Sequence, residues 1–226
     1  MTYLLLIGLG AAFIFPFFWM ITTSLKAPGK IYVDPPQWIP SPVYFANYAE
    51  TFQKLPFGAF IKNSVIITFF ATIGYVISST MAAYAFARIR FAGRSIYFAL
   101  LISTMMLPGQ VTLIPQFILF KTLGWLDTFL PLIVPPFFGS AFYIFLVRQF
   151  FMTLPVDLDE AALIDGANPL RIFWSVLMPL AKPAIATITV FAFIYNWNDF
   201  FGPLIYLTRQ EKHDPGRRPA DVPWAI

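Results

Sequence analysis

Residues 154–169 read LPVDLDEAALIDGANP, a charged stretch within a chain that is otherwise strongly apolar. Asp157 can cap a helix whose third residue is Glu160, because a carboxylate at the cap accepts a free backbone N–H of the first turn. Gly166 suits the left-handed residue just past a helix end, and Asn168-Pro169 suits the cap and first residue of the next helix. The stretch therefore predicts two short helices joined by a tight bend.

The first of these helices has about two turns, which is too short to be stable alone, so its neighbours or a partner must hold it. Three- and four-residue spacing places on one expected face Leu158, Ala161, Ala162 and Asp165. Two alanines on that face allow close approach, and Asp159, Glu160 and Asp165 add negative charge that a basic cleft would complement. Considered alone, such a loop is more often a solvated connector, so both interpretations stay open here.

The composition of the whole chain indicates a membrane protein. Of its 226 residues, 58% are hydrophobic, 19% are aromatic and 12% are charged, whereas about a quarter of a typical soluble domain is charged. The apolar residues gather into stretches near the length of about 20 residues that a helix needs to cross a hydrocarbon core. We therefore predict an all-α, polytopic integral membrane protein with a single membrane domain.

Five stretches are predicted to cross the membrane as helices. They run from about Tyr3 to Ser24, Asn63 to Ala87, Ser95 to Ile114, Thr128 to Val147, and Pro183 to Tyr206. Between the first two, the segment from Lys26 to Phe60 contains six prolines and predicts an exposed, irregular loop, because each proline removes a backbone donor. The second span carries Gly74 and Ser78, small residues that let a neighbouring element approach closely in lipid.

Two irregular features fall inside the predicted spans. Pro108-Gly109 interrupts the third span, where lipid cannot satisfy freed backbone groups, so this hinge or static kink must be buried in protein or hydrated. Asn196, Asn198 and Asp199 interrupt the fifth span, and polar groups at membrane depth indicate a substrate path or a paired structural site. Near the outer interface, they need be only a hydrated helix end.

Several chemistries are excluded by what the sequence lacks. It contains no cysteine and one histidine, His213, so a zinc or copper centre would need a mostly carboxylate ligand set, which those metals rarely accept. Gly29-Lys30 is followed by Ile31 rather than Ser or Thr, which does not match the phosphate-binding loop. We therefore predict no metal site, no bound cofactor and no catalytic residue, and any nucleotide chemistry must come from a partner.

The spacing of the charged loop carries a resemblance. Glu160-Ala161-Ala162, Gly166 four positions later and Pro179 thirteen beyond that resemble the cytoplasmic loop of permease subunits in bacterial binding-protein-dependent ABC importers. The family pattern has Ile and Leu before the proline, where this chain has Val176 and Met178. The segments similar to the sugar-transporting branch typified by the maltose system are Pro16 to Met20, Met105 to Pro115, and Asn196 to Phe200.

The resemblance covers nearly all of the chain up to Thr208, and it implies that residues 1–208 form an importer transmembrane domain with a cytoplasmic coupling loop at about 150–182. In that family the loop forms a coupling helix that docks in a groove of the ATP-binding subunit and transmits its closure to the membrane helices. The implied ATPase-coupling residues are Glu160 as the acidic contact, Ala161 and Ala162 as the close-packed surface, Asp165, Gly166 as the bend, and Pro179.

The implied function is a permease subunit of an ATP-driven carbohydrate importer in the bacterial cytoplasmic (inner) membrane, with Asn196, Asn198 and Asp199 as expected path residues. A polyol or glycerol phosphate would fit the same mechanism. The implied partners are cytoplasmic ATP-binding subunits, a second permease subunit, a periplasmic or lipid-anchored sugar-binding protein and membrane lipid, with no nucleic acid. A polytopic membrane enzyme or a simple channel remain further alternatives; an enzyme would need clustered carboxylates, histidines or arginines at one membrane face.

Both ends of the chain depart from the family pattern. Residues 209–226 change abruptly to charge, Pro and Gly where the resemblance implies a periplasmic loop and a sixth membrane helix. We expect an aberrant, disordered tail that follows from a frameshift or a truncated gene product. The family also begins with a basic cytoplasmic tail, whereas this chain begins almost inside its first span, which predicts a start assigned too late. Counting Lys and Arg on the two sides does not decide the orientation in the membrane.

Overall fold

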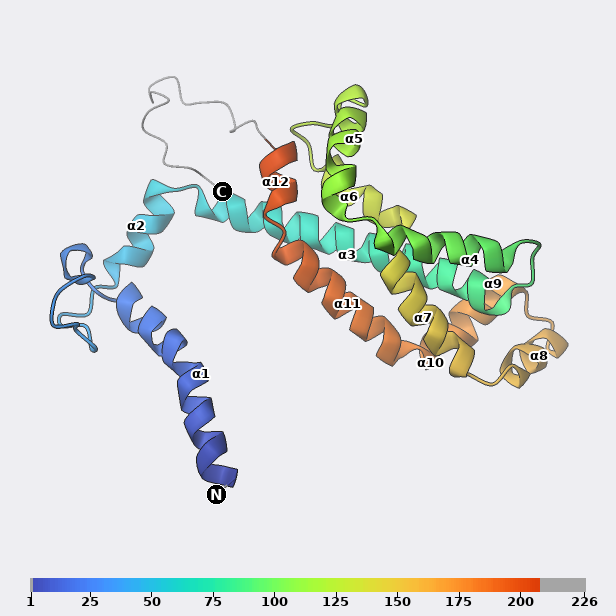
Figure 1. The fold of residues 1–226 in the computed structure, drawn as a ribbon, viewed down its shortest axis with the longest axis horizontal. Helices are drawn as coiled ribbons and strands as arrows, with labels where there is room; N and C mark the ends of the chain where they lie inside the picture. Colours follow the sequence, from blue (N-terminus) through green and yellow to red (C-terminus); the bar gives the residue numbers. More distant parts are fainter. Residues whose placement is uncertain (1, 208–226) are drawn as a thin grey trace. The chain divides into compact units, whose positions relative to one another are not determined.

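The computed structural model describes residues 2–207, and the tail predicted at 209–226 lies outside them. Within the described residues every regular element is a helix (Figure 1), which confirms the predicted all-α class. The chain forms two compact units that divide between Lys62 and Asn63.

The first unit is built from a long apolar helix and a loop. Helix α1 (Thr2–Ser24) confirms the first predicted span, and its apolar side chains stay exposed within the unit, as the side chains of a lipid-facing helix do. The prediction of an irregular loop up to Phe60 is wrong in its second half, because α2 (Ala46–Lys54) and the start of α3 (Phe57–Arg88) lie there. Pro56 directly precedes α3, where its missing N–H costs no helical hydrogen bond.

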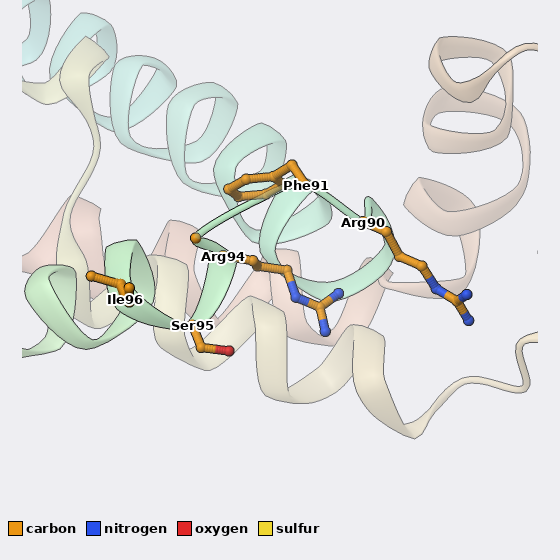
Figure 2. A pocket seen from close by; sticks show the side chains of 6 residues that line it. Arg90, Phe91, Arg94, Ser95 and Ile96 are labelled. Carbon is orange, nitrogen blue, oxygen red and sulfur yellow. The ribbon is translucent and has the colours of Figure 1, made fainter.

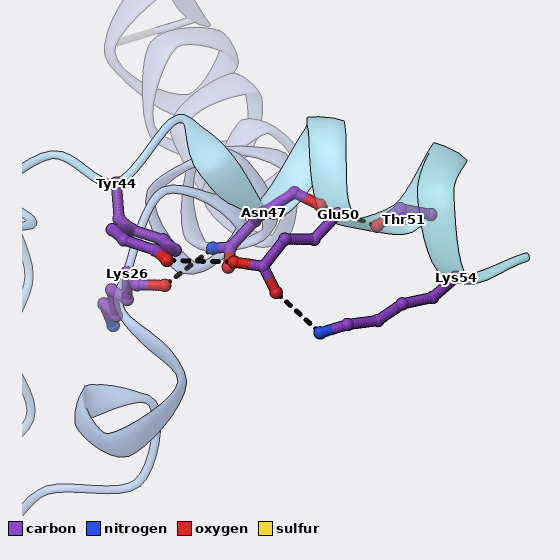
Figure 3. A network of polar contacts seen from close by, with 6 residues as sticks. All are labelled: Lys26, Tyr44, Asn47, Glu50, Thr51 and Lys54. Atoms are coloured by element: carbon purple, nitrogen blue, oxygen red, sulfur yellow. Dashed lines mark hydrogen bonds and ion pairs between the residues drawn. The ribbon is translucent and has the colours of Figure 1, made fainter.

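A polar network organises this loop (Figure 3). Glu50 on α2 accepts hydrogen bonds from Lys54 Nζ at 2.6 Å and from Tyr44 OH at 2.9 Å, and these bonds hold the pKa of the Glu50 carboxyl below its ordinary value. Asn47 Nδ2 donates to Lys26 O at 2.7 Å, which ties α2 to the end of α1. Side-chain hydrogen bonds therefore order this part of the loop, and the proline content of the segment did not indicate that order.

Helix α3 contains the second predicted span and begins six residues before the predicted start at Asn63. Its small residues meet a neighbour, as expected: Ser78 Oγ donates to Pro136 O at 2.9 Å. A Cβ atom built on Gly74 would lie 2.7 Å from the Phe137 ring. Both partners belong to the short 3-10 helix η3 (Pro135–Phe138), so this face of α3 receives the Pro-Pro elbow of the fourth span.

The third span is broken at the predicted position. Helix α4 (Arg94–Ser103) with η2 (Thr104–Met106) meets α5 (Gly109–Thr122) at an angle of 100°. Pro108 fixes its own φ and restricts Leu107 to the extended conformation, so the helix cannot continue through this point. The predicted end at Ile114 is wrong, because α5 continues for two more turns.

The fourth span is also interrupted, which was not predicted, and the fifth is interrupted at its polar residues, as expected. The fourth consists of α6 (Leu130–Ile133), η3 and α7 (Ala141–Thr153), and Gly139 separates the last two with a φ of +91°. The fifth consists of α11 (Lys182–Trp197) and α12 (Phe201–Tyr206), separated at Asn198. The charged loop between them contains α8 (Asp157–Ile164), α9 (Pro169–Ile172), the π-helical turn η4 (Phe173–Leu177) and α10 (Met178–Leu180).

By length and composition, three helical stretches of the described chain are long and apolar enough to cross a membrane: Thr2–Ser24, Phe57–Arg88 and Leu130–Thr153. Two bent helix pairs also qualify when each is taken as one span, which gives up to five. The predicted count of five is reached in this way, although the fifth stretch runs from Pro169 to Trp197 and the predicted one from Pro183 to Tyr206. The polytopic fold class is confirmed.

The main apolar core of the second unit lies where α3, α7, η4 and α11 meet. Helix α7 lies beside both α4 and α11 (Figure 1), and α11 follows α10 after a bend of 81°. Fully buried members of this cluster include Ala83, Val147, Phe151, Leu177 and Ile188. A second cluster, formed by Ile67, Phe120, Leu132 and Tyr206, joins α12 to α3, α5 and α6. The membrane end of the charged loop is thus anchored in the core.

The close contact at Gly74 predicts a stability effect. Gly74→Ala places a methyl group against the Phe137 ring and 3.1 Å from the Phe137 backbone nitrogen, and we expect this overpacking to cost about 1–3 kcal/mol of unfolding free energy. Gly58→Ala on the same helix is the control, because its Cβ position has no neighbour within 4 Å. Thermal denaturation of the detergent-solubilised chain compares the two, and equal stability of both variants would contradict the packing.

Candidate functional site

The charged loop has the predicted order of helix, bend and helix. Helix α8 ends in a left-handed Gly166 with a φ of +78°, and nothing lies within 4 Å of the position of its Cβ. Gly166 N donates to Leu163 O at 3.0 Å, and Ala167 N donates to Ala162 O at 2.9 Å. These two bonds satisfy carbonyls that a helix end otherwise leaves free, so the bend is built from the backbone around one glycine.

One of the two predicted helix caps is confirmed and the other is wrong. Asn168 Oδ1 accepts the backbone N–H of Arg171 at 2.8 Å, with Pro169 as the first helical residue. Asp157 is not the cap of α8: Val156 holds that position, and its carbonyl accepts the backbone N–H of Glu160 at 3.2 Å. The helix therefore starts one residue earlier than predicted, and Asp157 contributes only through its charge in the first turn.

The cap predicts a local stability effect. Asn168→Ala removes the acceptor of the Arg171 amide, and we expect it to cost about 1 kcal/mol in the opening of α9. Hydrogen exchange of the Arg171 amide should become about fivefold faster, because exchange reports the free energy of local opening. Asn168→Asp keeps an acceptor at the same atom and serves as the control; equally fast exchange in both variants would argue against the cap.

Most of the surface of α8 is exposed, and of the face that the spacing suggested, Leu158, Ala161 and Asp165 are exposed whereas Ala162 is not. Asp157, Glu160, Ala161 and Ile164 are all exposed and follow at positions i, i+3, i+4 and i+7, which places them on one side of the helix. We call these four residues the outward face. Ile164 is its most exposed member, with 87% of its surface accessible. Ala162 packs instead against the buried core cluster, and Asp165 is exposed beside the bend.

The acidic residues of α8 are divided between the two faces. Glu160 points outward, whereas the Asp159 side chain is 13% exposed and its Oδ2 lies 3.2 Å from Arg88 Nε at the end of α3. Burial raises the pKa of the Asp159 carboxyl, and the Arg88 charge opposes that rise. Sequence reasoning missed this pair, since nothing in the spacing of Arg88 and Asp159 indicates that they meet.

Pro179 stands inside α10, directly before the bend into α11. A proline has no N–H to donate to the carbonyl one helical turn before it. The preceding residues form the π-helical turn η4, and such wider turns occur where the ordinary hydrogen-bond pattern of a helix is interrupted. Pro179 therefore belongs to the break between the loop and the fifth span.

The three polar residues predicted in the substrate path all bond to nearby backbone. Asn196 Nδ2 donates to Ala192 O at 2.6 Å, and Asn198 Nδ2 donates to Ile194 O at 2.8 Å. Asp199 Oδ1 accepts the backbone N–H of Gly202 at 3.1 Å. These bonds stabilise the end of α11 and the turn into α12, so the structure brings the three residues together at one break in the helix.

A basic notch lies at the same end of α3 as the charged loop (Figure 2). It has a volume of about 410 Å³ and is lined by residues 90–96 except Ala92, with the guanidinium groups of Arg90 and Arg94 on its walls. Arg148 on α7 lies nearby, with its guanidinium carbon 4.0 Å from the centre of the Phe98 ring. Arg90, Arg94 and Arg148 therefore lie at the same end of the spans as the charged loop.

The described residues, 2 to 207, contain no group of three or more His, Cys, Asp or Glu side chains that could hold a metal ion. At the end of the spans where the arginines lie, the described residues form a short exposed helix, α8, on a loop that packs against the apolar core. The fold and this site together define a class, namely a polytopic all-α membrane protein with an exposed short helix on a polar loop at one end of its spans.

Comparison with known proteins identifies the family. The model of the binding-protein-dependent transport system inner membrane component matches residues 74–210, and the chain belongs to this family of ABC importer permease subunits of the inner membrane. The match includes the charged loop, the arginines that precede α4 and the described part of the fifth span.

Individual relatives agree with this assignment. The chain is 35% identical over 198 residues to the sn-glycerol-3-phosphate transport system permease protein UgpE of Yersinia pestis, covering 85% of this chain and 70% of the relative. It is 34% identical to a probable ABC transporter permease protein, PH1036 of Pyrococcus horikoshii, covering 91% and 76%. A solved bacterial ABC transporter involved in the import of the acidic polysaccharide alginate superimposes with a TM-score of 0.83 at 29% identity, covering 92% of this chain and 73% of that chain.

Proposed function

We propose that the chain is the permease subunit of an ATP-driven carbohydrate importer and that the outward face of α8 docks on a cytoplasmic ATP-binding subunit. The observation that carries this proposal is the exposure of Ile164, 87% accessible beside Glu160 and Ala161 on a short helix. A helix of this length needs contacts to remain folded. Ile164 and the neighbouring exposed Leu163 form an apolar patch among charged residues, and such a patch marks a surface that a partner covers. Ala161 keeps this face flat, and Gly166 fixes the direction in which the helix points.

In this proposal the chain contributes binding surfaces and has no catalytic site, metal site or cofactor of its own. ATP hydrolysis belongs to the partner subunit, whose groove would offer basic groups to Glu160. A second permease subunit supplies the other half of the translocation path, and a periplasmic or lipid-anchored binding protein delivers the substrate. Asp165 and Pro179 act indirectly, through the bend at Gly166 and the break before α11.

The substrate path is proposed to pass the break between α11 and α12. Asn198 is exposed there, and Asn196 and Asp199 are half-buried. Polar groups at such a break are costly in lipid and are therefore expected to face protein or water. Each amide retains hydrogen-bonding capacity beyond its one bond to the backbone, which suits a substrate rich in hydroxyl groups.

A carbohydrate is the leading substrate, and a polyol or glycerol phosphate is the second candidate. The relation to a solved alginate importer supports the first, and the relation to permeases named for sn-glycerol 3-phosphate supports the second. The positive charge of the basic notch does not distinguish the two substrates. The notch is lined by residues near the charged loop and not by residues of the break between α11 and α12.

Uptake by the complete transporter tests the proposal. Vesicles would contain the full chain with its partner permease and ATP-binding subunits, and would receive the cognate binding protein with radiolabelled oligosaccharides or with sn-glycerol 3-phosphate. ATP-dependent accumulation of an oligosaccharide is the expected result. Accumulation of glycerol phosphate alone would assign the second candidate, and equal uptake with and without ATP would overturn the importer function.

A further inference from the structure

The last turn of α3 holds the charged loop at three points. Arg88 Nη2 donates to Leu154 O at 2.8 Å, directly before the loop. Tyr84 OH donates to Pro169 O at 3.0 Å, directly after the bend. Between them, Arg88 Nε lies 3.2 Å from Asp159 Oδ2. A single turn of one membrane helix therefore contacts a residue that precedes α8, α8 itself and the first residue of α9.

The polar contacts are buried and specific. The side chains of Arg88 and Asp159 are only 8% and 13% exposed, and Asp159 Oδ1 has no hydrogen-bond partner among the described residues. Removing one member of such a pair leaves the other charge buried and uncompensated. The planar guanidinium of an arginine can contact a carbonyl and a carboxylate at once, through N–H groups held in a fixed geometry. The compact ammonium of a lysine does not reproduce this geometry. The pair therefore fixes where α8 sits on α3.

Apolar contacts complete the inner face of the loop. Ala162 and Ala167 pack against the buried cluster that contains Ala83 and Tyr84 of α3. The Tyr84 ring lies 5.3 Å from the ring of Phe173, the first residue of η4. The inner face of the loop is thus matched to α3, while the outward face remains available to a partner.

The same helix contacts a second irregular element further along the membrane span. Ser78 donates to Pro136 O, and Gly74 lies under the Phe137 ring in η3. From Gly74 to Arg88 the helix is continuous and about 21 Å long, at 1.5 Å per residue. A regular helix moves as a unit over this distance, so a displacement at Arg88 reaches the η3 elbow.

We propose that Arg88 and Asp159 are positioning residues that tie the charged loop to α3. Through this attachment, α3 transmits the movement of α8 to the η3 elbow in the membrane. This inference rests on the proposed docking of α8 on the ATP-binding subunit. It predicts that the pair can be removed without loss of docking and that transport per ATP hydrolysed then falls.

The test uses the complete transporter with Arg88→Gln, Asp159→Asn and the double variant. The double variant removes both charges and so avoids the unpaired buried charge that can prevent a single variant from folding. Arg90→Gln is the matched control, because it removes the same charge from an exposed residue two positions away. Three quantities are measured: co-purification of the ATP-binding subunits, ATP hydrolysis, and substrate uptake per ATP hydrolysed.

We expect the double variant to retain the ATP-binding subunits and its basal ATP hydrolysis, while uptake per ATP falls at least about fivefold, the lower range of an allosteric coupling. Arg90→Gln should leave all three quantities unchanged. Unaltered uptake per ATP in the double variant would overturn transmission through the pair. Loss of the ATP-binding subunits would overturn it as well, because the pair would then only shape the docking surface. Failure of the docking proposal itself would appear separately, as unchanged co-purification and uptake when the outward face is altered.

Discussion

Ile164→Asp is expected to abolish ATP-driven uptake while leaving the permease in the membrane. Ile164 is 87% exposed and makes no part of the buried core, so its replacement costs the isolated chain little stability. In the docked state its side chain would be buried, which is worth about 1.5–3 kcal/mol, and an aspartate there would also lose its hydration. Association with the ATP-binding subunit should weaken at least about tenfold.

Co-purification of the ATP-binding subunits with the tagged permease measures this effect directly, and uptake into vesicles measures its consequence. Ile164→Leu is the control, since it keeps an apolar side chain of the same size at the same position. Wild-type levels of both co-purification and uptake in Ile164→Asp would remove the main support for docking through α8.

Gly166→Pro is expected to have an effect of similar size for a different reason. Gly166 has a φ of +78°, whereas proline is restricted to about −65°. Its backbone N–H also donates to Leu163 O, a bond that proline cannot make. The bend must therefore open, and the outward face of α8 must turn away from its docking direction, so uptake should fall at least about tenfold.

A graded series separates conformation from steric fit at this position. Nothing lies within 4 Å of the Gly166 Cβ position, so any loss must follow from the backbone. Asn tolerates the left-handed region better than other residues, and a non-glycine residue there costs about 1–2 kcal/mol. Uptake should decrease in the order Gly, Asn, Ala, Pro; an Ala variant more active than the Asn variant would contradict the conformational account.

Much of the fold follows from properties of short segments, which can be predicted from the sequence. The apolar stretches had to become membrane helices, because only a helix satisfies its backbone within a single segment in lipid. The break at Pro108, the left-handed Gly166 and the Asn168 cap each depend on one residue and its immediate neighbours, and all three were predicted. The break at Gly139 was missed, since a glycine in an apolar run is compatible with a continuous helix.

The position of the charged loop and its bend could be predicted from the sequence, but the orientation of its first helix could not. The spacing from Glu160 to Gly166 and Pro179 located the loop and predicted its bend. The same spacing suggested a face that included Ala162, whereas Ile164 belongs to the outward face and Ala162 packs inward. Both faces have alanine and acidic residues at helical spacing, so periodicity alone could not say which one turns toward the membrane domain.

By itself, the sequence determined an all-α membrane protein with a polar helix–bend–helix loop, because composition, span length and turn chemistry are properties of short segments. Only the tertiary structure decided which side of α8 is free. That choice depends on Arg88, which is 71 positions before Asp159 in the chain and reaches it only when α3, η4 and α8 have packed together. Contacts between such distant residues are set by the packing of whole helices, so the docking face and its attachment to α3 became visible only in the folded chain.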